Sequence, residues 1–297
     1  MEMWKYATQI KIASSDPELA LEHLPNQQAF LMGVEVSTNS FGLRNDETIL
    51  KKPTNTYRIL VIGDSMTMGW GVRQEKTYPA QLEELLNAEP PDVFRNSVKF
   101  EVLNLGVGNY NTVQEIVYLR KVGLQFEPDI IILGYFINDA EPTPLVREGF
   151  LIENSYLYAF ILSRFRGLPI GNDALTDYQD YYSHLYLPDQ QGWKATKNSL
   201  IQFAEIGLES GIPIAIVIIP ELHDLSDTYP FSNIHDELAS IANDEKIPIV
   251  DLLPIFSGYT PEEDLWVSPN DAHLNEIGQS LAAHGIYDAL ANGSIKQ

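Results

Sequence analysis

The sequence predicts an α/β protein built on a doubly wound parallel sheet. Five short apolar runs of strand length lie between residues 59 and 252, and segments with helical spacing of apolar residues alternate with them. Such alternation is typical of a parallel sheet whose two faces are covered by helices. With 297 residues, the chain is long enough for one large domain of this class with a substantial core.

The expected strands are runs rich in apolar residues, and the one at 129–136 is nearly all apolar, as a strand buried on both faces is. They cover residues 59–62, 99–105, 129–136, 212–219 and 247–252. The expected helices carry apolar residues on one face, for example Leu82, Leu85 and Leu86 in the first of them. They cover residues 78–87, 113–122, 193–210, 231–243 and 274–291.

Residues 1–55 precede this alternation and are expected to form an N-terminal extension to a main domain at 56–297. Within the extension, 3–12 and 16–24 are expected as short helices. Residues 39–44 have the composition of a turn, and Arg44 at its end is expected to form a structural ion pair rather than to bind a ligand anion.

The segment 141–191 interrupts the alternation inside the main domain and is rich in tyrosine and phenylalanine. Connections of this length usually carry function or structure of their own. It is expected to be a helical insertion. It forms either a lid or sugar-stacking wall at the functional edge of the sheet, or a small satellite core.

Composition excludes several classes of function. The net charge is −22, from 19 basic and 41 acidic residues, which disfavours nucleic acid and anionic membranes as partners. The absence of cysteine excludes disulfides, thiolate catalysis and zinc–cysteine sites. No secretory signal or membrane span is visible, so a soluble, by default cytoplasmic, protein is expected. The oligomeric state stays open.

The first strand ends in Gly63-Asp64-Ser65. Open parallel sheets bind ligands at the carboxyl ends of their strands, so Ser65 lies where a nucleophile can act. It requires a base, an acid that orients the base, and donors for an oxyanion. Asp64 is expected to hold the turn rather than to take part in chemistry.

Among the six histidines, His273 has the sequence context that suits a base. It lies in a polar stretch, expected as a loop, just before the last helix. Asp271, two residues earlier, can bind one ring nitrogen and leave the other free to face Ser65. Asn270, three residues before the histidine, is uncharged and would orient the ring less strongly.

Two further strand ends offer donors for an oxyanion. Residues 104–112 read Asn-Leu-Gly-Val-Gly-Asn-Tyr-Asn-Thr, a tight loop whose backbone N–H groups can point at a ligand. Asn138 follows the third strand and can offer its side-chain amide. Asp139 beside it is expected to hold its turn, as Asp64 does.

In their order along the chain, these four motifs resemble the four motif blocks of the SGNH (GDSL) hydrolase superfamily. The resemblance runs from about residue 57 to residue 292. It implies a flavodoxin-like three-layer αβα sandwich with a five-stranded parallel sheet.

The resemblance also implies roles for individual residues. Ser65 corresponds to the nucleophile, His273 to the general base and Asp271 to the acid that orients it. The oxyanion hole would consist of the Ser65 backbone amide, a second backbone amide in the loop 104–112, and the Asn138 side chain.

Two positions depart from the family pattern. Asn109 stands where the second block usually has glycine, next to Gly108. Because the donor is a backbone N–H and asparagine tolerates left-handed φ, we expect Asn109 to serve, with Gly108 as the alternative. Asn270 occupies the position that is Asp in many members, so Asp271 must serve; without an orienting carboxylate the rate would fall by orders of magnitude.

The sequence therefore predicts a serine hydrolase that cleaves carboxylic esters through an acyl-enzyme, without metal or cofactor. The expected partner is a small-molecule or carbohydrate ester with a short acyl group such as acetyl. An acyltransferase acting on a sugar hydroxyl and a catalytically silent binding module stay open as alternatives. Glu221, His223 and Asp224 follow a strand but lack a clear ligand set for a metal.

Overall fold

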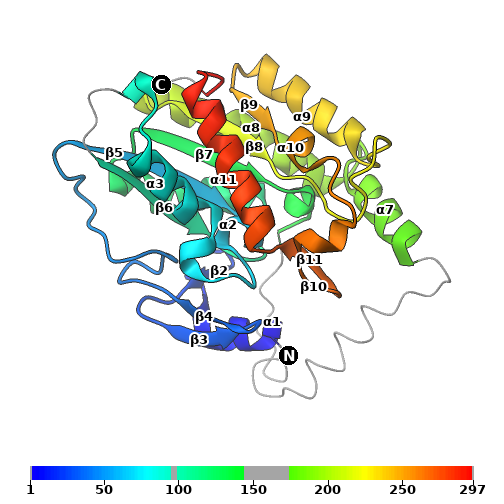
Figure 1. The fold of residues 1–297 in the computed structure, drawn as a ribbon, viewed down its shortest axis with the longest axis horizontal. Coiled ribbons are helices and arrows are strands. Elements are labelled where there is room, and N and C mark those ends of the chain that lie inside the picture. Colours follow the sequence, from blue (N-terminus) through cyan, green and yellow to red (C-terminus); the bar gives the residue numbers. More distant parts are fainter. Residues whose placement is uncertain (1, 95–98, 144–173, 296–297) are drawn as a thin grey trace.

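The computed structural model describes residues 2–94, 99–143 and 174–295. Its centre is a sheet of five strands in which every pairing is parallel (Figure 1). In spatial order the strands are β6 (Lys99–Gly106), β5 (Thr56–Gly63), β7 (Ile130–Tyr135), β8 (Ile214–Ile218) and β9 (Ile249–Asp251). The predicted parallel sheet is confirmed.

Helices cover both faces of this sheet. The chain moves from β5 to β6 in one direction and from β6 through β7 to β9 in the other, so right-handed crossovers put the connecting helices on opposite faces. One face carries α3 (Tyr78–Ala88) and α11 (Glu276–Ala291), which pack together. The other carries α4 (Thr112–Lys121), α8 (Gln191–Ser210) and α9 (Ser232–Asp244). This is the expected three-layer αβα sandwich. No helix in the described ranges is both long and apolar enough to cross a membrane.

Two polar caps fix where helices begin beside the functional edge. Asn111 accepts the Gln114 N–H at 3.1 Å, and the Gln114 side chain accepts the Asn111 N–H at 3.3 Å. Asn275 accepts the N–H groups of Ile277 and Gly278 at the start of α11. Such caps satisfy amides that have no partner within the helix. They therefore set the end of the loop before α4 and of the strand before α11.

The N-terminal extension forms a layer of its own at one end of the sheet (Figure 1, blue). It comprises α1 (Glu2–Lys5), η1 (Tyr6–Ile10), the hairpin of β1 (Lys11–Ala13) with β2 (Leu21–His23), and the hairpin of β3 (Gln28–Leu31) with β4 (Val34–Ser37). The helix expected at 3–12 is present over 2–10, but the helix expected at 16–24 is wrong. A single turn ends at Ala20, whose left-handed φ of 61° redirects the chain into β2.

The ion pair expected for Arg44 is also wrong. Its guanidinium is buried and donates to the main-chain oxygens of Met68 at 3.0 Å, Gly69 at 2.5 Å and Val72 at 2.6 Å. No carboxylate of the described residues pairs with it. Arg44 thereby fixes the turn that follows the short helix α2 (Ser65–Met68).

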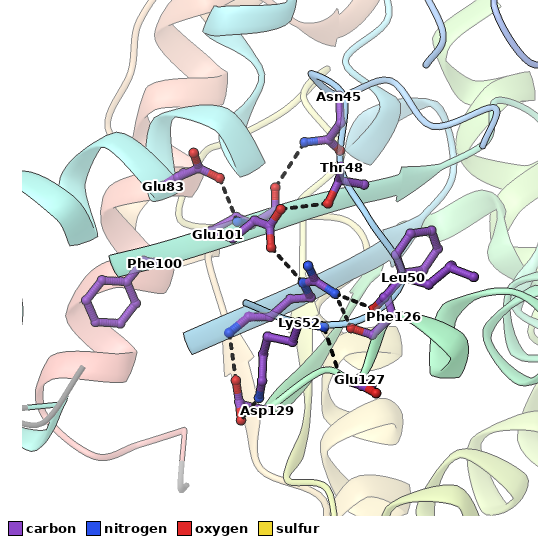
Figure 2. Close-up of polar contacts among 12 residues, drawn as sticks. Asn45, Thr48, Leu50, Lys52, Glu83, Phe100, Glu101, Phe126, Glu127 and Asp129 are labelled. Carbon is purple, nitrogen blue, oxygen red and sulfur yellow. Dashed lines mark hydrogen bonds and ion pairs between the residues drawn. The ribbon is translucent and has the colours of Figure 1, made fainter. Parts of the chain in front are cut away.

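The linker after the hairpins is fastened to the amino end of the sheet by a network of charged groups (Figure 2). Arg58 on β5 is fully buried and donates from Nε to Glu101 Oε2 at 2.7 Å. The backbone N–H of Arg58 donates to Asp129 Oδ2 at 2.7 Å, and Lys52 of the linker forms an ion pair with the same carboxylate. The linker is thus anchored at the end of the sheet opposite to Ser65.

Residues 144–173, most of the aromatic segment expected as an insertion, lie outside the described residues. The described part includes α7 (Ala174–Leu185) and the buried Tyr186. The Tyr186 hydroxyl lies 2.8 Å from that of Tyr135 on β7, and its ring packs against Trp193 at 4.8 Å between centroids. This end of the segment therefore packs into the main core.

Candidate active site

Three glycines in register make room for the serine at the end of β5. Gly63 lies opposite Gly106 of β6 and Gly134 of β7. A Cβ at Gly63 would lie 2.1 Å from Thr67 Oγ1, and one at Gly106 would lie 2.2 Å from the backbone nitrogen of Met68. The short helix α2 therefore rests directly on the backbone of these strand ends, which a larger residue would prevent.

Asp64 anchors the turn in front of Ser65. Its fully buried carboxylate accepts the Met66 N–H at 2.8 Å and the Asn138 Nδ2 amide at 3.1 Å, and lies 3.2 Å from Ser65 Oγ. Burial raises the pKa of the Asp64 carboxyl, against the lowering effect of these hydrogen bonds. Asp64 thus ties the serine to the end of β7.

Ser65, His273 and Asp271 form a continuous line of contacts. Ser65 Oγ lies 2.9 Å from His273 Nε2, and His273 Nδ1 lies 2.5 Å from Asp271 Oδ1. Ser65 itself is almost completely buried, while the ring and the carboxylate are partly exposed. The arrangement gives the imidazole an acceptor nitrogen toward the hydroxyl and a donor nitrogen toward the carboxylate.

The stretch around His273 is a β-hairpin rather than the expected loop. β10 (Trp266–Ser268) pairs with β11 (Asp271–Leu274), and the exposed Asn270 lies in the turn between them. Side chains two apart on a strand point to the same side, so Asp271 and His273 meet without any distortion of the backbone.

Trp70 also contacts this group, and sequence reasoning missed it. Its Nε1 donates to Asp271 Oδ2 at 3.0 Å, and its ring centroid lies 6.2 Å from that of His273. Burial by itself would raise the pKa of Asp271, but the hydrogen bonds from His273 and Trp70 and the His273 charge outweigh it, and the pKa is lowered. No sequence signal marks Trp70, because 201 residues separate it from its partner.

In the loop after β6, the backbone N–H of Asn109 has no acceptor among the described residues, unlike its neighbours. The backbone N–H groups of Gly106, Val107, Gly108 and Tyr110 all donate to acceptors inside the protein, at 2.8 to 3.1 Å. Among the described residues, none accepts the N–H of Asn109, which is exposed and has a left-handed φ of 67°. The Gly108 amide, the alternative donor, is occupied by the hydroxyl of Tyr6.

Asn138 lies in the short helical turn η5 (Ile137–Ala140), where β7 ends. One hydrogen of its amide group binds Asp64, which leaves the second hydrogen for a ligand. Its buried Oδ1 has no partner in the described part of the chain. Asp139 beside it accepts the Phe136 N–H at 3.1 Å and so holds this turn.

Glu221 and His223 lie after β8, and their side chains hydrogen-bond to each other. The rings of Tyr178 and Trp266 both pack against His223, with ring centroids 4.7 Å and 4.8 Å away. Within residues 2–94, 99–143 and 174–295, no group of three or more His, Asp or Glu side chains could hold a metal ion.

Comparison with known proteins identifies the relatives of this chain. Residues 61–281 match the model of the GDSL-like Lipase/Acylhydrolase family. No curated protein matches. Two solved structures align with a TM-score of 0.50, and at such low identity they show the fold alone. One is the crystal structure of TesA, with 13% identity over 79% of this chain and 98% of that chain. The other is LAE5, an α/β hydrolase enzyme from the metagenome of Lake Arreo, Spain, with 14% identity over 81% of this chain and 97% of that chain.

The family match begins within β5 and ends within α11, so it includes the carboxyl end of β5, the other four strands of the central sheet and most of the chain. It includes the strand ends that carry Ser65, the loop after β6, Asn138 and His273. This chain is therefore a member of the GDSL-like lipase/acylhydrolase family.

Proposed function

We propose that this protein is a serine hydrolase that cleaves carboxylic esters through an acyl-enzyme. The observation that carries the proposal is the unbroken line of contacts from Ser65 Oγ through the His273 ring to Asp271. Ser65 Oγ attacks the acyl carbon as His273 Nε2 takes its proton. The imidazolium then gives this proton to the leaving alcohol, and the acyl group stays on Ser65.

The second half of the reaction uses the same groups. His273 Nε2 removes a proton from water, the hydroxide oxygen bonds to the acyl carbon, and the Ser65–acyl bond breaks with return of the proton to Oγ. The negative oxygen of each tetrahedral intermediate is bound by the N–H groups of Ser65 and Asn109 and by the Asn138 amide. Fixed donors of this kind often supply the largest single part of the rate enhancement.

We further propose that the substrate is an acetyl or other short-chain ester of a carbohydrate. The partly exposed rings of Tyr178, His223 and Trp266 form a row, and Trp266 pairs with Leu274 in the hairpin that carries His273. Aromatic rings with polar edges suit the binding of a sugar. Binding energy from such a remote group can be used at the reacting carbon, so a small acyl group is sufficient.

Turnover and covalent labelling test the hydrolase proposal together. The native protein should hydrolyse p-nitrophenyl acetate, should cleave octanoate esters more slowly, and should react with a fluorophosphonate at Ser65, as located by peptide mass spectrometry. Ser65→Ala should do neither. Folded native protein that neither hydrolyses the ester nor takes up the label would contradict the proposal.

A product assay separates the hydrolase from the acyltransferase. With p-nitrophenyl acetate and an excess of a free sugar, a hydrolase releases acetate and nitrophenol in equal amounts. An acyltransferase releases nitrophenol and forms an acetylated sugar in place of acetate. Acetylated xylose and glucose as substrates then test whether the alcohol side is recognised as carbohydrate.

A further inference from the structure

The N-terminal extension contacts both polar main-chain atoms of Gly108. The Gly108 N–H donates to the Tyr6 hydroxyl at 2.8 Å, and the Lys11 ammonium donates to the Gly108 carbonyl oxygen. Lys11 Nζ also donates to Asn109 Oδ1 at 3.2 Å. These contacts bridge 97 to 102 residues of sequence, so they are tertiary contacts between the extension and the loop.

A chain of hydrogen bonds fixes the Tyr6 hydroxyl. Tyr6 Oη lies 2.6 Å from His23 Nε2, and His23 Nδ1 lies 3.2 Å from the carbonyl oxygen of Gly42. Burial lowers the pKa of His23 to about 3, and the Lys11 charge adds to this, so the ring is neutral at pH 7. A neutral ring that donates to Gly42 accepts the Tyr6 O–H, and the Tyr6 oxygen is then free to accept the Gly108 N–H.

Lys11 is buried without a counter-ion. Its side chain lies at the start of β1, opposite His23 on β2, and the residue is 4% exposed. Across the described residues no carboxylate forms an ion pair with it, and its ammonium lies 4.4 Å from the centroid of the Tyr6 ring. Burial lowers the pKa of Lys11 to about 7. Burying a cation without a counter-ion costs free energy, so the contact of Lys11 with the Gly108 carbonyl oxygen suggests a functional role.

The Gly108 oxygen and the Asn109 N–H belong to the same peptide unit. A peptide unit is planar, so a group that holds the oxygen also fixes the direction of the N–H. A cationic donor on the oxygen draws electron density from the amide and leaves the N–H more positive, because linked hydrogen bonds polarise one another. The N–H so affected is the one that lacks an acceptor in the loop after β6.

We propose that Lys11 is a positioning residue of the oxyanion hole. Its ammonium holds and polarises the Gly108–Asn109 peptide, so that the Asn109 N–H is presented to the negative oxygen of the tetrahedral intermediate. Tyr6 and His23 hold the preceding amide and stop the loop from turning over. This inference rests on the proposed esterase function. It adds that a segment outside the family match completes the site.

Lys11→Met removes the charge at nearly constant length. We expect kcat for p-nitrophenyl acetate to fall about 10- to 100-fold with KM changed by less than about threefold, since loss of a whole oxyanion donor costs about 10²- to 10³-fold. The affinity for a trifluoromethyl ketone, whose Ser65 adduct carries an oxyanion, should fall by the same factor. Lys11→Arg keeps the charge and should recover most of both losses.

Lys5→Met is the matched control, because Lys5 lies in the same extension and its ammonium, among the described residues, pairs with Glu2 at 3.0 Å. It should leave kcat, KM and inhibitor affinity unchanged. Equal kcat values in Lys11→Met and Lys5→Met would overturn the role of Lys11. A fall in kcat together with a comparable rise in KM would assign Lys11 to general folding of the extension and would likewise overturn its role in the oxyanion hole.

The amide proton of Asn109 gives a readout that does not depend on turnover or on a Lys11 variant that folds. In a His273→Gln background, its NMR shift should titrate with a midpoint near pH 7 as Lys11 loses its proton. Of the other titratable groups near Lys11, Tyr6 and His23 stay neutral at this pH, since burial raises the pKa of Tyr6 and lowers that of His23 to about 3, while Arg44 keeps its charge. An Asn109 shift that stays flat over the pH range in which the Lys11 side chain itself titrates by NMR would overturn the inference, whereas failure of native enzyme to label with fluorophosphonate would overturn only the esterase proposal.

Discussion

Asp271→Asn should be far more damaging than its small change in size suggests. The carboxylate accepts three hydrogen bonds: Oδ1 accepts from His273 Nδ1 and, at 3.2 Å, from the His273 backbone N–H, and Oδ2 accepts from Trp70 Nε1. Asparagine offers one acceptor and one donor, so it cannot satisfy both partners. The indole N–H can only donate, whereas the imidazole can change its tautomer, so we expect the amide oxygen to turn toward Trp70 and the NH₂ group toward His273 Nδ1, at the expense of the weaker bond from the His273 backbone N–H.

That orientation reverses the tautomer of the catalytic ring. A donor facing Nδ1 requires the proton to be on Nε2, and Nε2–H cannot accept a proton from Ser65. Loss of the correct tautomer in a serine triad costs about 10⁴-fold in kcat, or about 5.4 kcal/mol of transition-state stabilisation. We expect a loss of this size in steady-state turnover of p-nitrophenyl acetate, with folding checked by circular dichroism.

Substitution of Trp70 provides the most specific test of the tautomer change at His273. Trp70→Phe alone keeps the ring and removes one hydrogen bond to a charged group, so kcat should fall about tenfold. In the double variant the asparagine is free to turn its oxygen to His273 Nδ1, so Asp271→Asn with Trp70→Phe should be faster than Asp271→Asn alone, by about 10- to 100-fold.

The matched control is Asn270→Ala, because Asn270 directly precedes Asp271 and is exposed in the hairpin turn. It should change kcat by less than about twofold. An Asp271→Asn enzyme that retains native kcat would remove Asp271 from the triad. A double variant no faster than Asp271→Asn would refute the tautomer argument while leaving the orienting role of the carboxylate intact.

Two further predictions concern stability. His23 is neutral when folded and has a pKa of about 3 there against 6.5 when unfolded, so the unfolded chain binds more protons and stability falls as pH drops from about 6.5 toward 3. The slope is up to ~1.4 kcal/mol per pH unit; urea unfolding at pH 7, 5 and 4 should show it, and His23→Gln should remove it. Gly106→Ala places a Cβ against the backbone of α2 and should cost about 3 kcal/mol in urea unfolding, whereas Gly293→Ala, which meets no atom within 4 Å, should cost about 1 kcal/mol for its positive φ.

The central sheet could be predicted because its signals are local. Continuous apolar runs form most of β5, β7 and β8, and turn residues follow the strands, so the local sequence pattern was sufficient to find all five. The edge that carries Ser65 followed from topology, because parallel strands bring their carboxyl ends together. Asparagine tolerates left-handed φ, and Asn109 has a φ of 67°.

The extension could not be predicted in this way, because its structure depends on distant partners. The segment 16–24 has helix-forming residues, yet residues 21–23 gain more by pairing with β1 than by a short isolated helix. Arg44 carries a charge that suggests an ion pair, but three carbonyls exposed by the turn after α2 provide its partners. The contacts of Trp70 and Lys11 likewise have no local pattern.

The departure of the loop from the family pattern and the presence of the extension are linked by one contact. Asn109 stands where the resemblance led us to expect glycine, and its side-chain oxygen accepts from Lys11 at 3.2 Å. A glycine there would offer Lys11 only the Gly108 carbonyl. Residues 1–60 lie outside the family match, yet they supply the groups that hold the loop at both main-chain atoms of Gly108. We therefore infer that Asn109 and Lys11 act together. The loop lacks the conformational freedom of a glycine at position 109, and a charge from the extension holds the Gly108–Asn109 peptide in place.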